Sequence, residues 1–496
     1  MGGLVTADQK TMSLPRVLGP VQAYCVVVGC VIGSGIFLVP ASVAHAVPFI
    51  GGIALVWVVG GLFSTAGALT LAELGAMMPR AGGPYVYLRA AYGPIPAFLF
   101  GWSEFTVNRT GSMATLAAAF ARYFVHLVPP PPGVNGRVWQ AGAAVLAIAI
   151  VTIVNILGTR KGGTLQVLGT VLKVGGIVSL MILPLLIHRG SLGNLSPLWP
   201  SSLNRSVFTG MMAAMVGVLW AYDGWINITP LAEEIRDPGR NIPRSLVLGM
   251  ATLVLVYLGM TLAYHYVLPM IDVVQANQQA SGSEKAVAAV YCLHLLGDGG
   301  VLAVSLLVMC STFISLNGNA LTGPRAYFAM ARDGLLPHSF ARIHPRYHTP
   351  SNAVFAQGLW SIVLTIAGTV LIVVPPPTAG GTPGLVLRPI LTAWNQLNKT
   401  PLYDLLFTYV IFGVTVFYLL AITSVFVLRI KQPDLPRPYR TWGYPFTPLL
   451  YVAAAVFLLG NMLVDAQSRV QALGAIVIVL LGIPAWAILR RRPPRT

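Results

Sequence analysis

Long apolar runs separated by short polar segments dominate this chain of 496 residues. A helix of about 20 mostly apolar residues is long enough to cross the hydrocarbon core of a bilayer. The pattern predicts an all-α membrane protein with twelve transmembrane helices. We expect no cleavable signal peptide, because the first polar stretch leads directly into a full-length span. The predicted spans cover residues 17–44, 48–76, 95–127, 138–157, 164–188, 206–231, 243–268, 299–330, 351–374, 403–429, 447–464 and 470–489.

The first predicted span is interrupted near its middle. Residues Val31 to Phe37 read VIGSGIF, in which two glycines flank a serine. Each glycine costs a helix about 1 kcal/mol relative to alanine, and serine competes for backbone hydrogen bonds. We therefore expect the helix to break at Gly33-Ser34-Gly35.

A second break is expected in the sixth span. Residues Trp220 to Asn227 read WAYDGWIN, a polar and glycine-bearing patch that follows a mostly apolar stretch. An aspartate such as Asp223 is costly in hydrocarbon unless it faces protein or water. Interrupted helices five spans apart are typical of inverted-repeat transporters, which bind their substrates near the bilayer midplane.

Together the two breaks predict a site for a zwitterion. Amide groups freed at Gly33-Ser34-Gly35, beside a helix N-terminus, can bind a carboxylate through hydrogen bonds and the helix dipole. Carbonyl groups freed around Val31, Ile32 and residues 218–222 can accept hydrogen bonds from an ammonium group. The alternative is that the Gly-x-Gly pair only lets two helices pack closely, as is common in membranes. The second break favours the binding site.

Composition and charge support the membrane assignment. Hydrophobic residues make up 56% of the chain and charged residues only 9%, whereas soluble domains carry about 25% charged residues. The net charge is +17, and with the N-terminus inside, 20 of the 31 Lys and Arg residues fall on the cytoplasmic side, 7 in outer loops and 4 within spans. This bias predicts a multi-pass protein of the plasma (inner) membrane with both termini in the cytoplasm, and no nucleic-acid partner.

The sequence does not indicate enzymatic or metal chemistry. Cys25, Cys30, Cys292 and Cys310 lie in or beside apolar segments without metal-ligand spacing, so we expect neither a disulfide nor a metal site. Glu73, Glu104 and the eight His residues show no paired-carboxylate, H-E-x-x-H or nucleophile-elbow spacing, and the sequence contains no P-loop. We therefore expect no cofactor, no enzyme activity and no ATP-driven transport. A sensor that binds an amino acid without moving it is the competing class, and a channel is a weaker third.

Five motifs occur in order along almost the whole chain. They are VIGSGIF at 31–37; Glu73-Leu74-Gly75 with PRAGGPYVY at 79–87; Trp220–Trp225 with EEIRDP at 233–238 and NIPR at 241–244; LNGN at 316–319 with Pro324-Arg325 and ARDGLLP at 331–337; and RPYRTWGYP at 437–445. In this order and at these intervals the motifs resemble the amino acid–polyamine–organocation transporters, and most closely the L-type amino acid transporter branch.

The resemblance implies a single transporter domain with a LeuT-like core. Two inverted five-helix repeats, 17–188 and 206–429, would precede two additional helices at 447–489. The broken helices 1 and 6 would line the substrate site, and Trp220 would be an aromatic gate over the bound amino acid. Its alternative is an ordinary packing role, although it lies near mid-span and not at a headgroup belt. The implied substrate-binding residues are Ile32, Gly33, Ser34, Gly35, Leu219, Trp220, Ala221, Tyr222, Asp223 and Gly224.

Lys173 lies deep in the fifth span, about 13 Å of helix from its start. The resemblance places it where sodium-coupled relatives bind a cation between spans 1 and 8. Its ammonium group would then hold carbonyl groups of the broken first span together with Ser311, Thr312 or Ser315. Sodium-independent exchange is the resulting expectation. Snorkelling toward the membrane surface, or a titrating lysine that couples transport to protons, are the alternatives.

Other polar residues within the spans have open roles. Glu104 and Arg109 are five apart, so a regular helix would not align them, whereas Glu104 and Asn108 are four apart. Arg109 is expected at the depth of Gly33, either near the cavity or in a bridge to a neighbouring helix. Asp223 either caps the unwound sixth span or lets the pocket accept cationic side chains, as in some relatives. We expect large neutral amino acids as substrates, with cationic ones as the alternative.

Two segments depart from the animal L-type pattern. The loop at 128–136 contains no cysteine, whereas heteromeric animal members use one there to tether a glycoprotein subunit. We therefore expect no disulfide-linked heavy-chain subunit, and only the amino acid substrate and the lipid bilayer as partners. The outer segment Pro375–Thr400 is rich in Pro, Gly and Thr and longer than most connections, so it would cap the outer side or move freely. The oligomeric state is open.

Overall fold

The computed structural model describes residues 13–202, 204–278, 287–373, 402–464 and 466–490. Within these ranges the regular structure is helical, and the only strand-like feature is a single parallel bridge between Leu18 and Ile235. The expected all-α class is therefore confirmed for the described part of the chain. The segment at 375–400, for which we expected a cap or a free loop, lies outside the described residues.

Helices of 9 to 30 residues make up most of the described ranges. Their bounds are α2 (Pro20–Val31), α3 (Gly35–Ala46), α4 (Ile50–Met77), α5 (Pro84–Tyr92), α6 (Pro94–Ser103), α7 (Arg109–Leu127), α8 (Gly136–Ile156), α9 (Thr159–Leu186), α10 (Arg205–Ala221), α11 (Pro238–Val267), α12 (Met270–Gln278), α13 (Val287–Leu296), α14 (Asp298–Thr322), α15 (Pro324–Arg332), α16 (Ser351–Val373), α18 (Leu402–Lys431), α19 (Phe446–Val464), α20 (Ala466–Leu480) and α21 (Gly482–Arg490).

Among the described residues, ten helices are long and apolar enough to cross a membrane, and the bent pair α2 and α3 would be an eleventh. This is one fewer than the twelve spans predicted. The difference is the predicted third span, which is divided among α6, a π-helical turn η1 (Glu104–Asn108) and α7.

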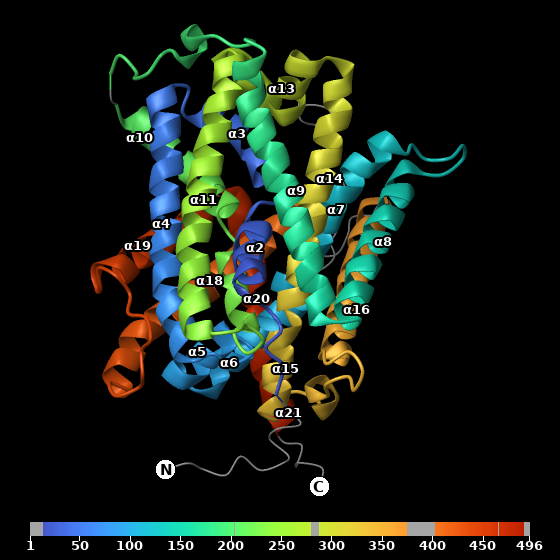
Figure 1. Cartoon of the computed structure of the whole chain (residues 1–496), viewed down its shortest axis with the longest axis vertical. Helices are drawn as coiled ribbons and strands as arrows, with labels where there is room; N and C mark the ends of the chain where they lie inside the picture. Colours follow the sequence, from blue (N-terminus) through green and yellow to red (C-terminus); the bar gives the residue numbers. More distant parts are fainter. Residues whose placement is uncertain (1–12, 203, 279–286, 374–401, 465, 491–496) are drawn as a thin grey trace, which may run out of the picture.

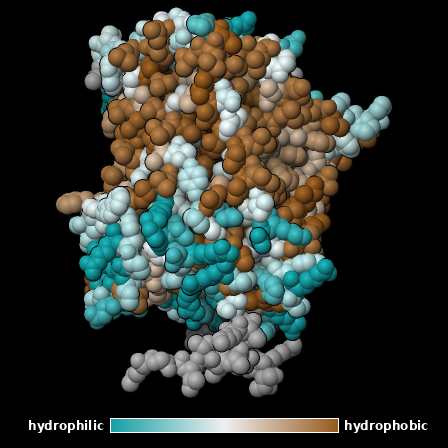
Figure 2. All heavy atoms as spheres, viewed as in Figure 1, coloured by the Kyte–Doolittle hydropathy of each residue, from teal (hydrophilic) through white to brown (hydrophobic). Residues whose placement is uncertain are grey.

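The long helices stand side by side as an upright bundle (Figure 1). The short helices α5, α6, α15 and α21 gather at the lower end, and α3, α10 and α13 lie toward the upper end. Hydrophobic residues cover the upper and central part of the face shown in Figure 2, whereas hydrophilic residues collect at the lower end. An apolar belt beside a polar end is the surface expected of a protein embedded in a bilayer.

The first span breaks at the predicted position. α2 ends at Val31, α3 begins at Gly35, and the two axes are bent by 42°. Between them Ile32 leaves helical geometry with ψ 89°. The N-cap residue Ser34 makes no side-chain capping bond to α3, and the first helical hydrogen bond runs from the Phe37 amide to the Ser34 carbonyl at 3.1 Å. The amides of Gly35 and Ile36 therefore have no acceptor within the helix.

The sixth span also loses regular helical geometry where a break was predicted. α10 ends at Ala221, and a turn through Gly224 leads into the 3-10 helix η3 (Trp225–Leu231). Gly224 has φ +118°, a conformation that glycine adopts far more readily than other residues. A Cβ added there would lie 3.1 Å from the carbonyl carbon of Cys30. Gly224 therefore lets the turn pack directly on the backbone of the first span.

The π-helical turn in the third span corrects an expectation about Glu104 and Arg109. Hydrogen bonds in a π-helix join residues five apart, so this turn brings residues at that spacing into line. Nη2 of Arg109 lies 2.8 Å from Oε2 of Glu104. Asn108, expected to be the better placed partner, instead donates to the Ser103 hydroxyl at 2.8 Å. The prediction was wrong because it assumed regular α-helical spacing.

Ion pairs hold several spans together at the polar end. Glu234 is fully buried, and its Oε1 accepts a hydrogen bond from Nε of Arg325 at 2.7 Å. Beside it, Glu233 accepts hydrogen bonds from Arg332 at 2.8 and 3.0 Å and from two backbone amides. Burial alone would raise the pKa of Glu233, but the hydrogen bonds and charge of Arg332, with those two amides, outweigh burial and hold this pKa below its usual range.

Candidate functional site

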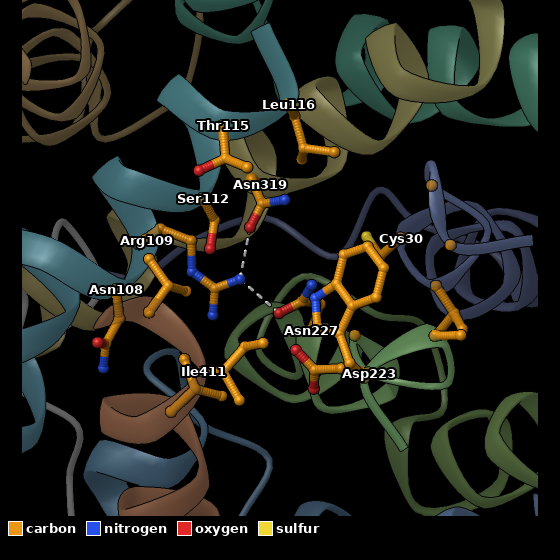
Figure 3. Close-up of a pocket in the computed structure, with 18 of the residues that line it drawn as sticks. Cys30, Asn108, Arg109, Ser112, Thr115, Leu116, Asp223, Asn227, Asn319 and Ile411 are labelled. Atoms are coloured by element: carbon orange, nitrogen blue, oxygen red, sulfur yellow. Dashed lines mark hydrogen bonds between the residues drawn. The ribbon is translucent and has the colours of Figure 1, made fainter. Parts of the chain in front are cut away.

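A cavity lies between the two broken spans, and residues of η1, α7, α14 and α18 complete its wall (Figure 3). Ile32, Leu219 and Tyr222 were also predicted to bind substrate but do not line this cavity. Leu219 borders a neighbouring cavity, and Tyr222 is buried with its hydroxyl donating to the carbonyl of Trp57. The predicted substrate-binding residues that do line the cavity are Gly33, Ser34, Gly35, Trp220, Ala221, Asp223 and Gly224.

Gly35 lies where α3 passes close to α10. A Cβ added to Gly35 would lie 3.0 Å from Cβ and 3.1 Å from Cα of Ala221, and 3.5 Å from the ring of Trp220. Ordinary carbon–carbon contacts are about 3.5–4.0 Å, so a glycine is needed for this approach. At Gly33 an added Cβ would lie 3.7 Å from the nearest side-chain atom, so a methyl group fits there.

Complementary backbone groups surround the cavity. The amides of Gly35 and Ile36 precede the first helical hydrogen bond of α3 and have no acceptor within that helix. At the end of α10, the amides of Tyr222 and Asp223 donate to the carbonyls of Val218 and Trp220 at 3.1 and 2.9 Å. The Tyr257 hydroxyl lies 2.9 Å from the carbonyl oxygen of Ala221 and 3.1 Å from that of Val31. One hydroxyl has a single hydrogen to donate, so this tyrosine leaves acceptor capacity at these two carbonyls while linking both broken spans.

Lys173 inserts its ammonium group beneath the first break. The side chain is fully buried, so the snorkelling alternative is wrong. Its Nζ lies 2.6 Å from the carbonyl oxygen of Gly29, 2.5 Å from that of Ile32, 3.3 Å from the Ser315 hydroxyl and 3.4 Å from the Ser311 carbonyl oxygen. Because the Ile32 carbonyl already accepts from Lys173, our expectation that it receives a substrate ammonium group has no support in these contacts.

Two of the three predicted α14 residues contact the broken first span. Ser311 and Ser315 direct their hydroxyls to carbonyl oxygens of that span at 2.9–3.1 Å. Thr312 instead donates to the carbonyl of Val308, one turn earlier in its own helix, at 2.8 Å. Lys173 and the two serines therefore hold the end of α2 from two neighbouring helices.

Arg109 combines the two roles left open for it. Its Nη1 donates to Oδ1 of Asn227 at 2.5 Å and to Oδ1 of Asn319 at 2.8 Å, as the dashed lines in Figure 3 show. Its Nε donates to Glu104 at 3.0 Å. The guanidinium group thus borders the cavity and also joins the third, sixth and eighth predicted spans.

Asp223 and Trp220 stand where the main cavity meets a second one. Both residues border both cavities, and the second extends toward Tyr451 of α19. The carboxylate of Asp223 faces the main cavity (Figure 3), which fits the alternative that the pocket accepts cationic side chains.

Sequence reasoning missed several polar residues of the cavity wall. Asn108, Ser112 and Thr115 all line the cavity and follow the i, i+4, i+7 spacing of one helix face. That spacing was a usable signal. Asn227 and Asn319 also line the cavity, but each belongs to a motif whose local pattern says nothing about where its side chain points.

Comparison with known proteins agrees with the family resemblance found in the sequence motifs. Residues 18–484 match the amino acid permease family. The chain is 29% identical to the b(0,+)-type amino acid transporter 1 of Mus musculus, over 96% of this chain and 88% of that protein. It is 27% identical to the serine/threonine exchanger SteT of Bacillus subtilis (strain 168), over 97% and 98%, and 29% identical to the large neutral amino acids transporter small subunit 2 of Mus musculus, over 96% and 81%. The chain belongs to the amino acid permease family.

Proposed function

We propose that this protein is a secondary transporter that exchanges amino acids across the plasma membrane by alternating access, without sodium. In this proposal α6, η1 and α7 together form the third span, which brings the total to twelve. Residues 17–188 and 206–429 are the two inverted repeats of a LeuT-like core, and 447–489 supply two additional helices. The named relatives support exchange, since one of them is a serine/threonine exchanger.

The observation that carries the proposal is the meeting of two interrupted spans at one cavity. Gly35 and Gly224 let the breaks approach closely, so that amides of α3 and carbonyls of α2 and α10 border the same space. The positive end of the α3 dipole attracts a carboxylate, and the negative ends of α2 and α10 attract an ammonium group. An α-amino acid carries both groups on one carbon.

The substrate side chain would extend from this backbone site toward α18. Val410, Ile411 and Val414 make that wall apolar, which favours large neutral side chains. Asp223 adds one carboxylate, which favours cationic side chains as a second substrate class. Trp220 borders the cavity beside Gly35 and would close over the bound amino acid.

Lys173 supports independence from sodium. Sodium, like other hard cations, is bound by oxygen ligands, and the Lys173 ammonium group already contacts oxygens of α2 and α14. A permanent positive charge on Lys173 would stabilise the carbonyl groups at the break in the first span without a bound sodium ion. A lysine that releases its proton during the cycle is the alternative, and it would couple uptake to a proton gradient.

We further infer that the chain works without a disulfide-linked subunit and has both termini in the cytoplasm. All four cysteines lie in the described part of the chain and are unpaired, and none lies in the loop at 128–136. The excess of Lys and Arg on the side that carries the N-terminus supports the orientation.

Counterflow in proteoliposomes tests the proposed function. Vesicles loaded with one unlabelled amino acid, and matched empty vesicles, are given a panel of labelled amino acids outside in sodium-free buffer. We expect labelled large neutral amino acids to accumulate only in loaded vesicles. Equal uptake with and without internal substrate would contradict exchange. Saturable binding without any uptake would favour the sensor.

A further inference from the structure

We propose that a basic groove at the polar end of the molecule binds the phosphodiester headgroup of an anionic phospholipid. Three segments form this groove, which lies outside the transport site: the N-terminal segment 15–17, the turn after α8 together with the first residues of α9 (157–164), and the loop at 346–348. In Figure 1 the turn lies at the lower end of both helices.

The charge of the groove is wholly positive. Arg160, Lys161 and Arg346 line it, all three are exposed, and no Asp or Glu is among the described residues that line it. In the part of the chain that the structure describes, none of the three forms an ion pair with a carboxylate. Buried arginines nearby, such as Arg325, are paired with glutamates, so the groove holds cations that still lack a counter-charge.

Backbone groups add to the attraction for an anion. α9 begins at Thr159, directly in the groove, after Gly158, which has no side chain to cap the helix. The first amides of the helix therefore have no helical acceptor, and the dipole of this 28-residue helix places positive potential there. A phosphate oxygen would meet amides and cationic side chains together.

A lipid-facing surface begins immediately above the groove. On α9, Leu168 and Leu172 are each 65% exposed and Val171 is 64% exposed, and on α8 Ile153 is 56% exposed. Lys161 and Leu168 are seven residues apart, about 10 Å along the helix. This separation matches the depth from lipid phosphates to the upper acyl chain, since the interfacial region adds about 5–8 Å on each side of the hydrocarbon core.

The cationic groove adjoins the exposed apolar face of α9, and this favours a phospholipid over free phosphate as the ligand. Free phosphate would use only the groove, whereas a phospholipid would also cover Leu168 and Leu172 with its acyl chain. Basic pockets between membrane helices are a known type of site for anionic headgroups, and each Lys or Arg near an anionic surface contributes about a fivefold gain in affinity. The bound phospholipid would connect two parts of the chain, the segment that precedes α2 and the helix α9, which carries Lys173.

Native mass spectrometry of the full chain, purified with equal amounts of phosphatidylglycerol and phosphatidylcholine, tests the site. We expect the wild-type protein to retain phosphatidylglycerol in preference. Arg160→Gln with Lys161→Gln should weaken this retention roughly thirtyfold. The matched control, Arg240→Gln with Arg244→Gln, removes two exposed cations at the start of α11 and should retain the lipid like the wild type. Arg346→Gln alone should weaken retention about fivefold.

Three results would overturn the proposal. One is equal loss of phosphatidylglycerol from the groove variant and the α11 control, which would show only general surface charge. Another is retention of phosphatidylcholine as strong as that of phosphatidylglycerol. The third is displacement of the lipid by excess inorganic phosphate, which would indicate a site for free phosphate. Monodisperse elution of each variant establishes that it is folded.

Discussion

A single methyl group at Gly35 should separate the two broken spans. An added Cβ would lie 3.0 Å from Cβ of Ala221, so α3 and α10 must move apart by about 0.5–1 Å to restore ordinary contact. Such overpacking costs about 1–3 kcal/mol. If that strain falls on the substrate-bound geometry, Gly35→Ala should weaken substrate affinity roughly 5–150-fold. Isothermal titration calorimetry with a substrate identified by counterflow measures this change.

Gly33→Ala is the matched control for that experiment. An alanine at either position favours a continuous helix by about 1 kcal/mol relative to glycine, but at Gly33 the added Cβ meets its nearest side-chain atom at 3.7 Å. We expect Gly33→Ala to bind within about threefold of the wild type. Equal losses of substrate affinity in both variants would show that affinity depends on the backbone freedom of glycine and not on the close contact with Ala221. Wild-type affinity in Gly35→Ala would refute the reasoning altogether.

Three further substitutions test other residues of the site and an ion pair at the polar end of the molecule. Lys173→Ala should abolish most exchange because it removes the donor to the carbonyl groups of Gly29 and Ile32. Replacing sodium by choline should leave wild-type uptake unchanged, and sodium-stimulated uptake would refute the role given to Lys173. Trp220→Ala should lower exchange roughly tenfold, about 1.4 kcal/mol, with little change in melting temperature, and the reverse pattern would indicate a packing role. The pKa of Glu233 is depressed in the folded protein, so the ionised carboxylate contributes its full stabilisation above about pH 4.3, and this stabilisation is lost as the pH falls through the folded pKa. Glu233→Gln should therefore flatten the acid side of a plot of melting temperature against pH. An unchanged acid slope would argue against this role of Glu233.

The breaks in the first and sixth spans could be predicted because their cause is local. Glycine and serine at 33–35 weaken the helix regardless of what surrounds them, and α2 and α3 end and begin around those residues. The depth of Lys173 could likewise be counted along the helix. Its oxygen partners were predicted only through resemblance, and Thr312 differs because its hydroxyl bonds within its own helix.

The π-helical turn and the network of Arg109 could not be read from local pattern. The predicted third span is mostly apolar on both sides of residues 104–108, and nothing in its spacing distinguishes a π-helical turn from a regular α-helix. The partners Asn227 and Asn319 lie 118 and 210 residues away along the chain. Their contact with Arg109 depends on how the third, sixth and eighth spans pack together.

The most direct test of the central account is whether both charges of the amino acid are needed at the broken-helix site. Sodium-free exchange is measured in proteoliposomes while three competitors are added outside: the amino acid that counterflow identifies, its methyl ester, and its N-acetyl derivative. Amides of α3 should require the carboxylate, and the carbonyl ends of α2 and α10 should require the ammonium group. The account predicts that only the unmodified amino acid competes strongly. Equal competition by either derivative would contradict recognition of a zwitterion by the two breaks.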